Sequence, residues 1–337
     1  MTKTTASKEE HRSIDSDERL LVADIGGTNA RFAISVYGEI GLSQLLSLPT
    51  RHYHGVIPAA RAYLDQITGE RPSRACMAVA CPVWGDSVSL TNNDWSFSIE
   101  NVRQSLNLKH LMVVNDFKAL ATGVSLLGVD DRMQIGVGEP VPDRPISVIG
   151  PGTGLGVASV VEDSGRRIVL DGEGGHVGFA PGTEREIEIL KILSRRYGRV
   201  SVERILSGEG LTALYTALAE IDGIEAADLN AADIVKRAKS GSCKLCMNTI
   251  NLFCSALGSF AGDTAMTMSS QGGVYIGGGI VPRMADLLIN SPFRERFETK
   301  GRTSSYIKNV PTYLITTEYA ALRGAASLLR GGFRARD

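Results

Sequence analysis

The chain has 337 residues, with 36 basic and 37 acidic side chains, so its formal net charge is −1. At roughly 150 residues per domain this length predicts about two domains and excludes a single small module. The balanced charge excludes a nucleic-acid partner held by bulk positive charge. Hydrophobic residues make up 43% of the chain, enough to bury sizeable cores.

The polar and apolar pattern disfavours export and membrane insertion. Residues 1–18 are polar and lack the apolar centre of a secretory signal, so we interpret them as a mobile N-terminal extension. The apolar stretches are interrupted within about a dozen residues, short of the ~18 that a membrane span needs. We therefore expect a cytoplasmic protein with no membrane partner.

The five cysteines are odd in number and lie mostly in apolar runs, which suits a reducing compartment better than a disulfide framework. Cys243 and Cys246 have the C-x-x-C spacing of metal or redox sites. No second pair of ligands lies nearby, so the sequence favours a structural role for both residues.

Strand-like and helical segments alternate along the chain, which predicts an α/β architecture. A first hairpin is expected at 20–25 and 30–36, and a second around 154–161. The other expected strands are 75–80, 111–114, 146–149, 274–276 and 313–315, and the clearest helices are 187–197, 244–266 and 319–329.

Three glycine-rich turns follow strands, and each has two interpretations. They are 24–31 (DIGGTNAR), 150–156 (GPGTGLG) and 277–280 (GGGI). Glycine lets the backbone approach a ligand closely, so successive N–H groups of the first two turns can face an anion, and a planar ring can lie on the third. The alternatives are ordinary hairpin and strand-to-helix turns. The first turn matches neither the Walker nor the Rossmann pattern.

Polar residues gather at two further points. Asn115 and Asp116 follow an apolar strand, where they either cap a helix or present a carboxylate at the carboxyl end of the strand. Glu173 and His176 lie in the glycine-rich segment 172–176. They are either ordinary surface side chains or residues that contact a ligand.

Together these motifs resemble those of the sugar kinase, hsp70 and actin superfamily. The segment 24–31 is similar to its first phosphate segment, 150–156 to its second, and 274–280 to its adenosine segment. Passages such as VVNDF, GEGGHVGFAP and VSVERILSGEGL resemble the bacterial glucokinase family of the enterobacterial type, and the resemblance covers about 20–329. The histidine and cysteine zinc motif of the other bacterial branch is missing, so we expect no zinc.

The resemblance implies a two-lobe, actin-like ATPase (ribonuclease H-like) α/β fold with an interlobe cleft. The small lobe is expected at 19–126 plus 317–337 and the large lobe at 127–316. The resemblance also implies a homodimer. The activity implied is transfer of the γ-phosphoryl group of ATP to the 6-hydroxyl of D-glucose.

Site residues follow from the same resemblance. Glucose is expected to bind Asn115, Asp116, Glu173, His176 and Glu203, with Asp116 as the general base. ATP is expected to bind Asp24, Gly26, Gly27, Thr28, Asn29, Gly152, Thr153, Gly154, Gly277, Gly278 and Gly279, with Asp24 orienting Mg²⁺ through water. The alternatives are a kinase for mannose, fructose or glucosamine, a sugar-responsive regulator without catalysis, and an actin-like ATPase.

Overall fold

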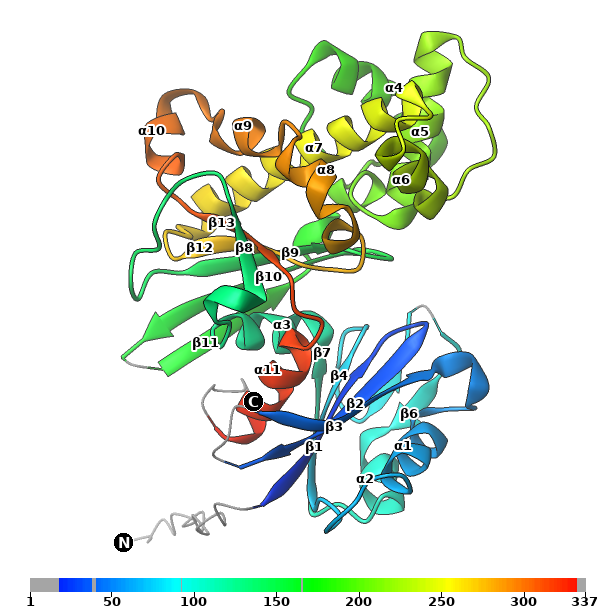
Figure 1. Cartoon of the computed structure of the whole chain (residues 1–337), viewed down its shortest axis with the longest axis vertical. Helices are drawn as coiled ribbons and strands as arrows, with labels where there is room; N and C mark the ends of the chain where they lie inside the picture. The colour runs from blue at the N-terminus through cyan, green and yellow to red at the C-terminus, as the bar shows by residue number, and fades with distance from the viewer. Residues whose placement is uncertain (1–17, 38–40, 92, 165, 332–337) are drawn as a thin grey trace, which may run out of the picture.

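The computed structural model describes residues 18–37, 41–91, 93–164 and 166–331. Of the mobile extension predicted at 1–18, residues 1–17 lie outside the described residues. Glu18 contradicts that prediction, because its carbonyl accepts a hydrogen bond from the amide of Tyr37 at 2.8 Å and its Oε1 accepts one from Ser73 Oγ at 2.9 Å. Two β-sheets organise the chain, one of five strands and one of six. Figure 1 shows them as separate lobes, with helices α3 (Asp116–Val124) and α11 (Ala320–Leu329) lying between. The predicted α/β two-lobe fold is confirmed.

The five-stranded sheet belongs to the N-terminal part of the chain. Its strand order is β3 (Leu42–Pro49), β2 (Asn29–Val36), β1 (Arg19–Ile25), β4 (Arg74–Val79) and β7 (His110–Asn115). β1 and β2 form the predicted hairpin, whereas β4 and β7 run parallel to β1. Parallel strands end at the same edge, so the carboxyl ends of β1, β4 and β7 lie next to one another.

Alternation along β1 explains why this sheet is covered on both faces. Leu21 and Ala23 belong to the core cluster of α1 (Val56–Leu64) and α2 (Ile99–Ser105), and Leu20 and Val22 to the cluster that contains α3 and α11. A small hairpin of β5 (Ser87–Ser89) and β6 (Ser96–Ser98) precedes α2.

The six-stranded sheet has the order β11 (Arg166–Gly172), β10 (Leu155–Asp163), β9 (Ile146–Pro151), β12 (Gly273–Ile276), β13 (Thr312–Ile315) and β8 (Arg132–Ile135). The predicted second hairpin is β9–β10. The helices on its outer side are α4 (Glu184–Tyr197), α5 (Gly208–Asp222), α6 (Ala231–Lys239), α7 (Lys244–Met268), α8 (Ala285–Ile289), α9 (Phe293–Glu298) and α10 (Ser304–Ile307).

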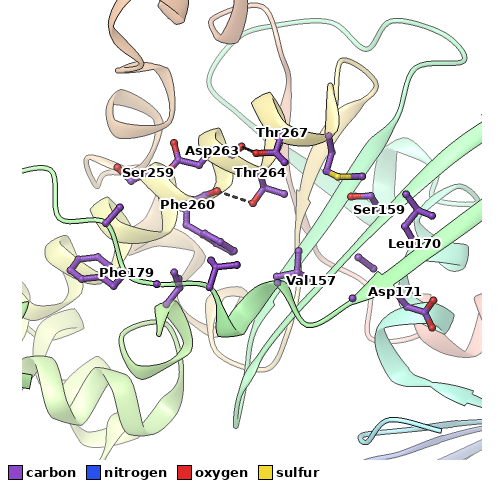
Figure 2. Close-up of a pocket in the computed structure, with 18 of the residues that line it drawn as sticks. Val157, Ser159, Leu170, Asp171, Phe179, Ser259, Phe260, Asp263, Thr264 and Thr267 are labelled. Atoms are coloured by element: carbon purple, nitrogen blue, oxygen red, sulfur yellow. Dashed lines mark hydrogen bonds between the residues drawn. The ribbon is translucent and has the colours of Figure 1, made fainter. Parts of the chain in front are cut away.

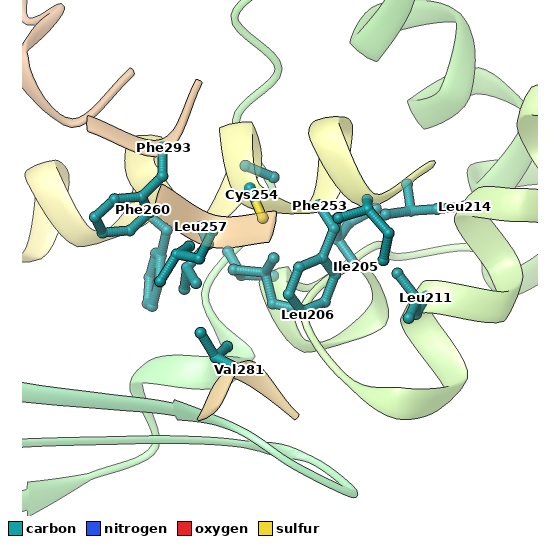
Figure 3. Packing of buried hydrophobic residues seen from close by; sticks show 14 of the residues in the cluster. Ile205, Leu206, Leu211, Leu214, Phe253, Cys254, Leu257, Phe260, Val281 and Phe293 are labelled. Carbon is teal, nitrogen blue, oxygen red and sulfur yellow. The ribbon is translucent and has the colours of Figure 1, made fainter. Parts of the chain in front are cut away.

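Helix α7 is the centre of the large core. Phe253, Cys254 and Leu257 are fully buried, and Figure 3 shows them packed with side chains of α5 and of the segments around it. By length and composition α7 is apolar enough to cross a membrane, contrary to the expectation from the sequence. Of its most apolar window, 61% is buried against the rest of the protein, which is typical of a core helix.

Helices α3 and α11 join the two lobes. They cross at Gly123 and Gly324, where an added Cβ would lie only 1.9 Å from the carbonyl oxygen of Ala320 or 1.8 Å from that of Ala119. Only glycine permits this backbone approach. The cluster around them contains residues of both sheets, so the C-terminal helix returns to the first lobe and closes the core between the lobes.

Candidate active site

The carboxyl edge of the five-stranded sheet carries two acidic side chains. Ile25 of β1 is level with Val79 of β4, which is level with Asn115 of β7. Asp24 and Asp116 therefore lie at one edge, one strand apart. The pKa of Asp116 is sensitive to the negative charge of Asp24, which shows that the two carboxyl groups are close in space.

Asp116 is the more strongly perturbed of the two acids. Burial and, to a smaller extent, the charge of Asp24 raise its pKa to about 7, because hydrogen bonds from the backbone and Asn115 only partly oppose them. One of these bonds is donated by the amide of Phe117 to Asp116 Oδ1 at 2.9 Å. A carboxyl group with a pKa near 7 is suited to exchange protons at neutral pH.

Asp24 is 18% exposed and has a cationic neighbour. Burial raises its pKa, although Arg31, whose Nη1 lies 3.1 Å from Asp24 Oδ2, acts in the opposite direction. Arg31 comes from the adjacent strand of the hairpin, directly opposite Asp24. The arginine therefore partly balances the negative charge that two neighbouring carboxyl groups bring to this edge.

Asn115 serves as a helix cap. Its Oδ1 accepts hydrogen bonds from the amides of Phe117 at 2.9 Å and Lys118 at 3.3 Å, and its Nδ2 donates to the carbonyl of Cys81 at 3.3 Å. The cap positions the N-terminus of α3, and with it Asp116. The two interpretations of Asn115-Asp116 are thus compatible, since capping places the carboxylate at the strand end.

The large lobe contributes a second polar cluster. Glu203, in the short 3₁₀ helix Val202–Arg204, accepts a hydrogen bond from the amide of Leu155 at 2.8 Å through Oε2. His176 Nε2 lies 3.8 Å from Glu203 Oε1, and His176 Nδ1 lies 3.7 Å from Glu173 Oε2. The structure therefore brings together three of the predicted sugar ligands from two segments.

The first glycine-rich turn is a tight β-hairpin turn. The amide of Gly26 donates to the carbonyl of Asn29 at 3.0 Å. From outside the turn, Thr50 donates its amide to Thr28 O at 2.9 Å and its hydroxyl to Gly27 O at 2.7 Å. The turn is thus fixed by Thr50, and it lies beside Asp24 at the same sheet edge.

The second and third turns are bonded to each other. Gly277 donates its amide to Ile149 O at 2.8 Å, and Ile280 donates to Pro151 O at 3.2 Å. Gly152 donates to Gly154 O at 2.8 Å and accepts from the amide of Gly208 at the start of α5. The predicted second phosphate segment and adenosine segment therefore form one continuous surface. Thr153 is exposed on it.

Phe117 and Lys118 adjoin Asp116 and contact the large lobe, which the sequence interpretation did not predict. An added Cβ on Gly156 would lie 2.0 Å from the Phe117 ring, so this glycine makes room for an aromatic side chain from the other lobe. Lys118 Nζ lies 3.7 Å from Asp171 Oδ2 of β11. The signal was present in the sequence, since both residues directly follow Asp116.

Among residues 18–37, 41–91, 93–164 and 166–331 no group of three or more histidine, cysteine, aspartate or glutamate side chains is placed to hold a metal ion. The acidic pair Asp24 and Asp116 fits a hydrated Mg²⁺ instead. This cation binds through one or two carboxylates, waters and substrate phosphates, and a cation at this edge would offset the negative charge of Asp24, which together with burial raises the pKa of Asp116.

A cavity of about 540 Å³ lies elsewhere, between β10, β11 and α7. Figure 2 shows Val157, Leu170 and Phe260 among its lining side chains, and the backbone at Gly172 and Gly174 also lines it. The segment that carries Glu173 and His176 forms part of its wall, through Gly172, Gly174 and Val177. Its walls are largely apolar, so they offer few hydrogen bonds to a neutral polyol. The two polar clusters described above offer more hydrogen-bonding groups to such a ligand.

Known proteins share both the sequence and the fold. A family model described as glucokinase matches residues 21–331. A protein of Chromobacterium violaceum named glucokinase is 47% identical over 309 residues, which are 92% of this chain and 88% of that protein.

Two solved structures agree with this relation. The structure of a glucokinase from an Antarctic psychrotroph has a TM-score of 0.85 and 39% identity, covering 93% of this chain and 99% of the other. The second is the structure of a ROK family glucokinase from Streptomyces griseus in complex with glucose and AMPPNP. Its TM-score is 0.65 at 20% identity, covering 92% of this chain and 98% of the other, which shows a shared fold. With a family match over nearly its whole length, the chain belongs to the glucokinase family of hexose kinases.

Proposed function

We propose that the chain transfers the γ-phosphoryl group of ATP to the 6-hydroxyl of D-glucose, with Asp116 as general base. The observation that carries this proposal is the Asp116 carboxyl group, held at the end of β7 with a pKa of about 7. In this reaction the 6-hydroxyl oxygen attacks phosphorus while its proton moves to the Asp116 carboxylate, and ADP leaves.

Glucose binding is assigned to Asn115, Asp116, Glu173, His176 and Glu203. A neutral polyol offers no charge, so it is recognised by hydrogen bonds to each hydroxyl, and an unpaired polar group in the site is costly. Glu203 Oε1 and the His176 ring offer an acceptor and a donor within 3.8 Å of each other. Such a pair suits two neighbouring hydroxyl groups of one sugar.

ATP binding is assigned to the three glycine-rich turns, at Asp24, Gly26, Gly27, Thr28, Asn29, Gly152, Thr153, Gly154, Gly277, Gly278 and Gly279. The amides of the first two turns are suited to the phosphates, and the flat backbone of the third to the adenine ring. Asp24 would hold Mg²⁺ through water, and the cation would neutralise charge on the phosphates.

Lobe limits at 19–126 plus 317–337 and at 127–316 are part of the proposal. The contacts of α11 with β1 and β4 support the assignment of the C-terminal segment to the small lobe.

We further propose a homodimer in the cytoplasm, since this family tends to pair. A single species of about 36 kDa in sedimentation at micromolar concentration would contradict the dimer.

A coupled assay with a panel of hexoses and phosphoryl donors tests the activity. Glucose with ATP and Mg²⁺ should have the highest kcat/KM, and mannose, fructose and glucosamine should be poorer by at least tenfold, about 1.4 kcal/mol. Faster phosphorylation of another hexose would identify a different sugar kinase. ATP hydrolysis that no sugar stimulates would indicate an actin-like ATPase, and sugar binding without turnover a regulator.

A further inference from the structure

Two thiols that the proposed kinase site does not use meet at the N-terminus of α7. Cys243 is the residue that caps the helix, and its Sγ accepts a hydrogen bond from the amide of Cys246 at 3.3 Å. The C-x-x-C spacing therefore places both thiols at the first turn of a 25-residue helix, with one thiol bonded to the backbone amide of the other residue.

The two thiols differ in accessibility. Cys243 is partly exposed, whereas Cys246 is fully buried in the large core. The other cysteines, Cys76, Cys81 and Cys254, are buried as well. A reagent in solution therefore reaches Cys243 before any other thiol, and Cys246 becomes accessible only to a group already attached to Cys243.

The surroundings of Cys243 favour its thiolate. Burial raises the pKa of Cys243, but the hydrogen bonds from Cys246 and from the backbone, together with the charge of Arg237, outweigh burial and lower it. Burial raises the pKa of Cys246 to about 12. This asymmetry is typical of a helix-terminal pair with one nucleophilic sulfur and one protonated partner.

We propose that Cys243 and Cys246 form a reversible redox site, in which Cys243 attacks a small-molecule disulfide and Cys246 resolves the product. In the first step the Cys243 thiolate forms a bond to one sulfur of the reagent, whose S–S bond breaks and releases a thiolate. In the second step the Cys246 thiol loses its proton and attacks Cys243 Sγ, which releases the second half of the reagent as a thiolate. The protein is oxidised by two electrons and the reagent is reduced to two thiols.

The geometry favours this chemistry over the structural role that the spacing alone suggested. A purely structural cysteine is buried and inert, as Cys254 is within the same helix. Zinc requires about four ligands, and among the described residues no further histidine, cysteine or acidic side chains complete a metal site.

Titration of the full chain with dithiobis(nitrobenzoate), a chromogenic disulfide, tests the site. The wild-type protein should rapidly release two equivalents of thionitrobenzoate and carry no aryl group, with a mass lower by two hydrogens. Cys246→Ser should release one equivalent and retain one aryl group. Cys243→Ser should lose the fast phase, with a release rate at least about 100-fold lower because the remaining thiols are buried.

Arg237→Gln is the matched control for the charge beside Cys243, and it should slow the fast phase severalfold without changing the two-equivalent stoichiometry. The rate of glucose phosphorylation of each reduced variant reports whether it is folded, so a failure of the redox site is distinguishable from a failure of the kinase assignment. A fast phase that survives in Cys243→Ser, a stable aryl adduct on the wild-type protein, or no fast phase at all would overturn the proposal.

Discussion

The two polar clusters of the proposed site are built in opposite ways. On the small lobe, Asp24 is 18% exposed and burial raises the pKa of both acids. On the large lobe, Glu173 and His176 are 74% and 59% exposed, and Glu203 is 29% exposed. One cluster sits on the rigid ends of paired strands, whereas the other sits mainly on a glycine-rich loop.

Under the proposed function, this difference assigns the reaction to the small-lobe cluster and sugar recognition to the large-lobe cluster. Removing a carboxylate from water raises its proton affinity, which a general base needs and a sugar contact does not. Under the proposed function, the exposed loop would admit the sugar and then close over it. We therefore expect variants of the small-lobe cluster to affect kcat and variants of the large-lobe cluster to affect KM.

Asp116→Asn should have the largest effect, because it preserves the shape of the side chain but removes its ability to accept a proton. We expect kcat to fall by roughly 10²-fold or more and glucose binding to change little. Steady-state kinetics with glucose should show equal losses in kcat and kcat/KM. Near-full kcat with a raised KM would mean that Asp116 only holds the sugar.

Glu203→Gln and His176→Ala should mainly raise the glucose KM. Loss of one hydrogen-bonding partner costs about 1–3 kcal/mol, which corresponds to roughly 5- to 150-fold. Glu203→Gln should have the larger effect because Glu203 is the less exposed side chain and also accepts from Leu155. Initial rates over a range of glucose concentrations check both variants, and a loss confined to kcat would contradict the division between the lobes.

The pH dependence should follow Asp116. Only its carboxylate accepts a proton, so kcat/KM should fall about tenfold per pH unit below a pKa near 7. Asp24→Asn removes a nearby negative charge, which lowers the pKa of Asp116 and should move the acid limb to lower pH. The measurement is kcat/KM of the wild-type protein and of Asp24→Asn between about pH 5 and 9, a range that brackets the Asp116 pKa of about 7. An unshifted limb would show that the two acids are not coupled.

The smallest expected effect is on stability. The pKa of Asp116 is higher in the folded chain, about 7, than its ordinary value of 3.8, so the folded state binds the proton more tightly. Its ionisation therefore destabilises the fold as pH rises from about 4 through 7. Asp116→Asn should raise the free energy of unfolding at pH 8 by ~1–3 kcal/mol.

Thermal unfolding of Asp116→Asn and the wild-type protein between pH 5 and 8 should show this gain shrinking toward low pH, by at most about 1.36 kcal/mol per pH unit below the folded-state pKa of Asp116. Glu203→Gln is the matched control, since it also replaces a carboxylate by an amide. A gain of equal size for both variants, or one that does not depend on pH, would contradict the assignment of this destabilisation to the ionised Asp116 carboxylate.

The sequence by itself determined part of the local elements. Apolar runs that meet glycine predicted β1, β9 and β12, and helical spacing stopped by Gly198 predicted α4, because these patterns depend on neighbours in the chain. Short or edge elements such as β3, β5, β6 and β8 were not predicted. The motifs also predicted the family, which the comparisons confirm. The assigned roles of the site residues stay predictions.

Tertiary structure decided what lies beside what. Asp24 and Asp116 are 92 positions apart in the chain, and the parallel register of β1, β4 and β7 places them at one edge. The fit of Phe117 against Gly156 and the contact of Lys118 with Asp171 depend on how two lobes pack. The accessibility of the Cys243 thiol and its lowered pKa likewise depend on residues near it in space, Arg237 among them. The burial of a side chain and the charges around it are set by its neighbours in space. Many of these neighbours are distant in the chain, so a short stretch of sequence does not reveal them.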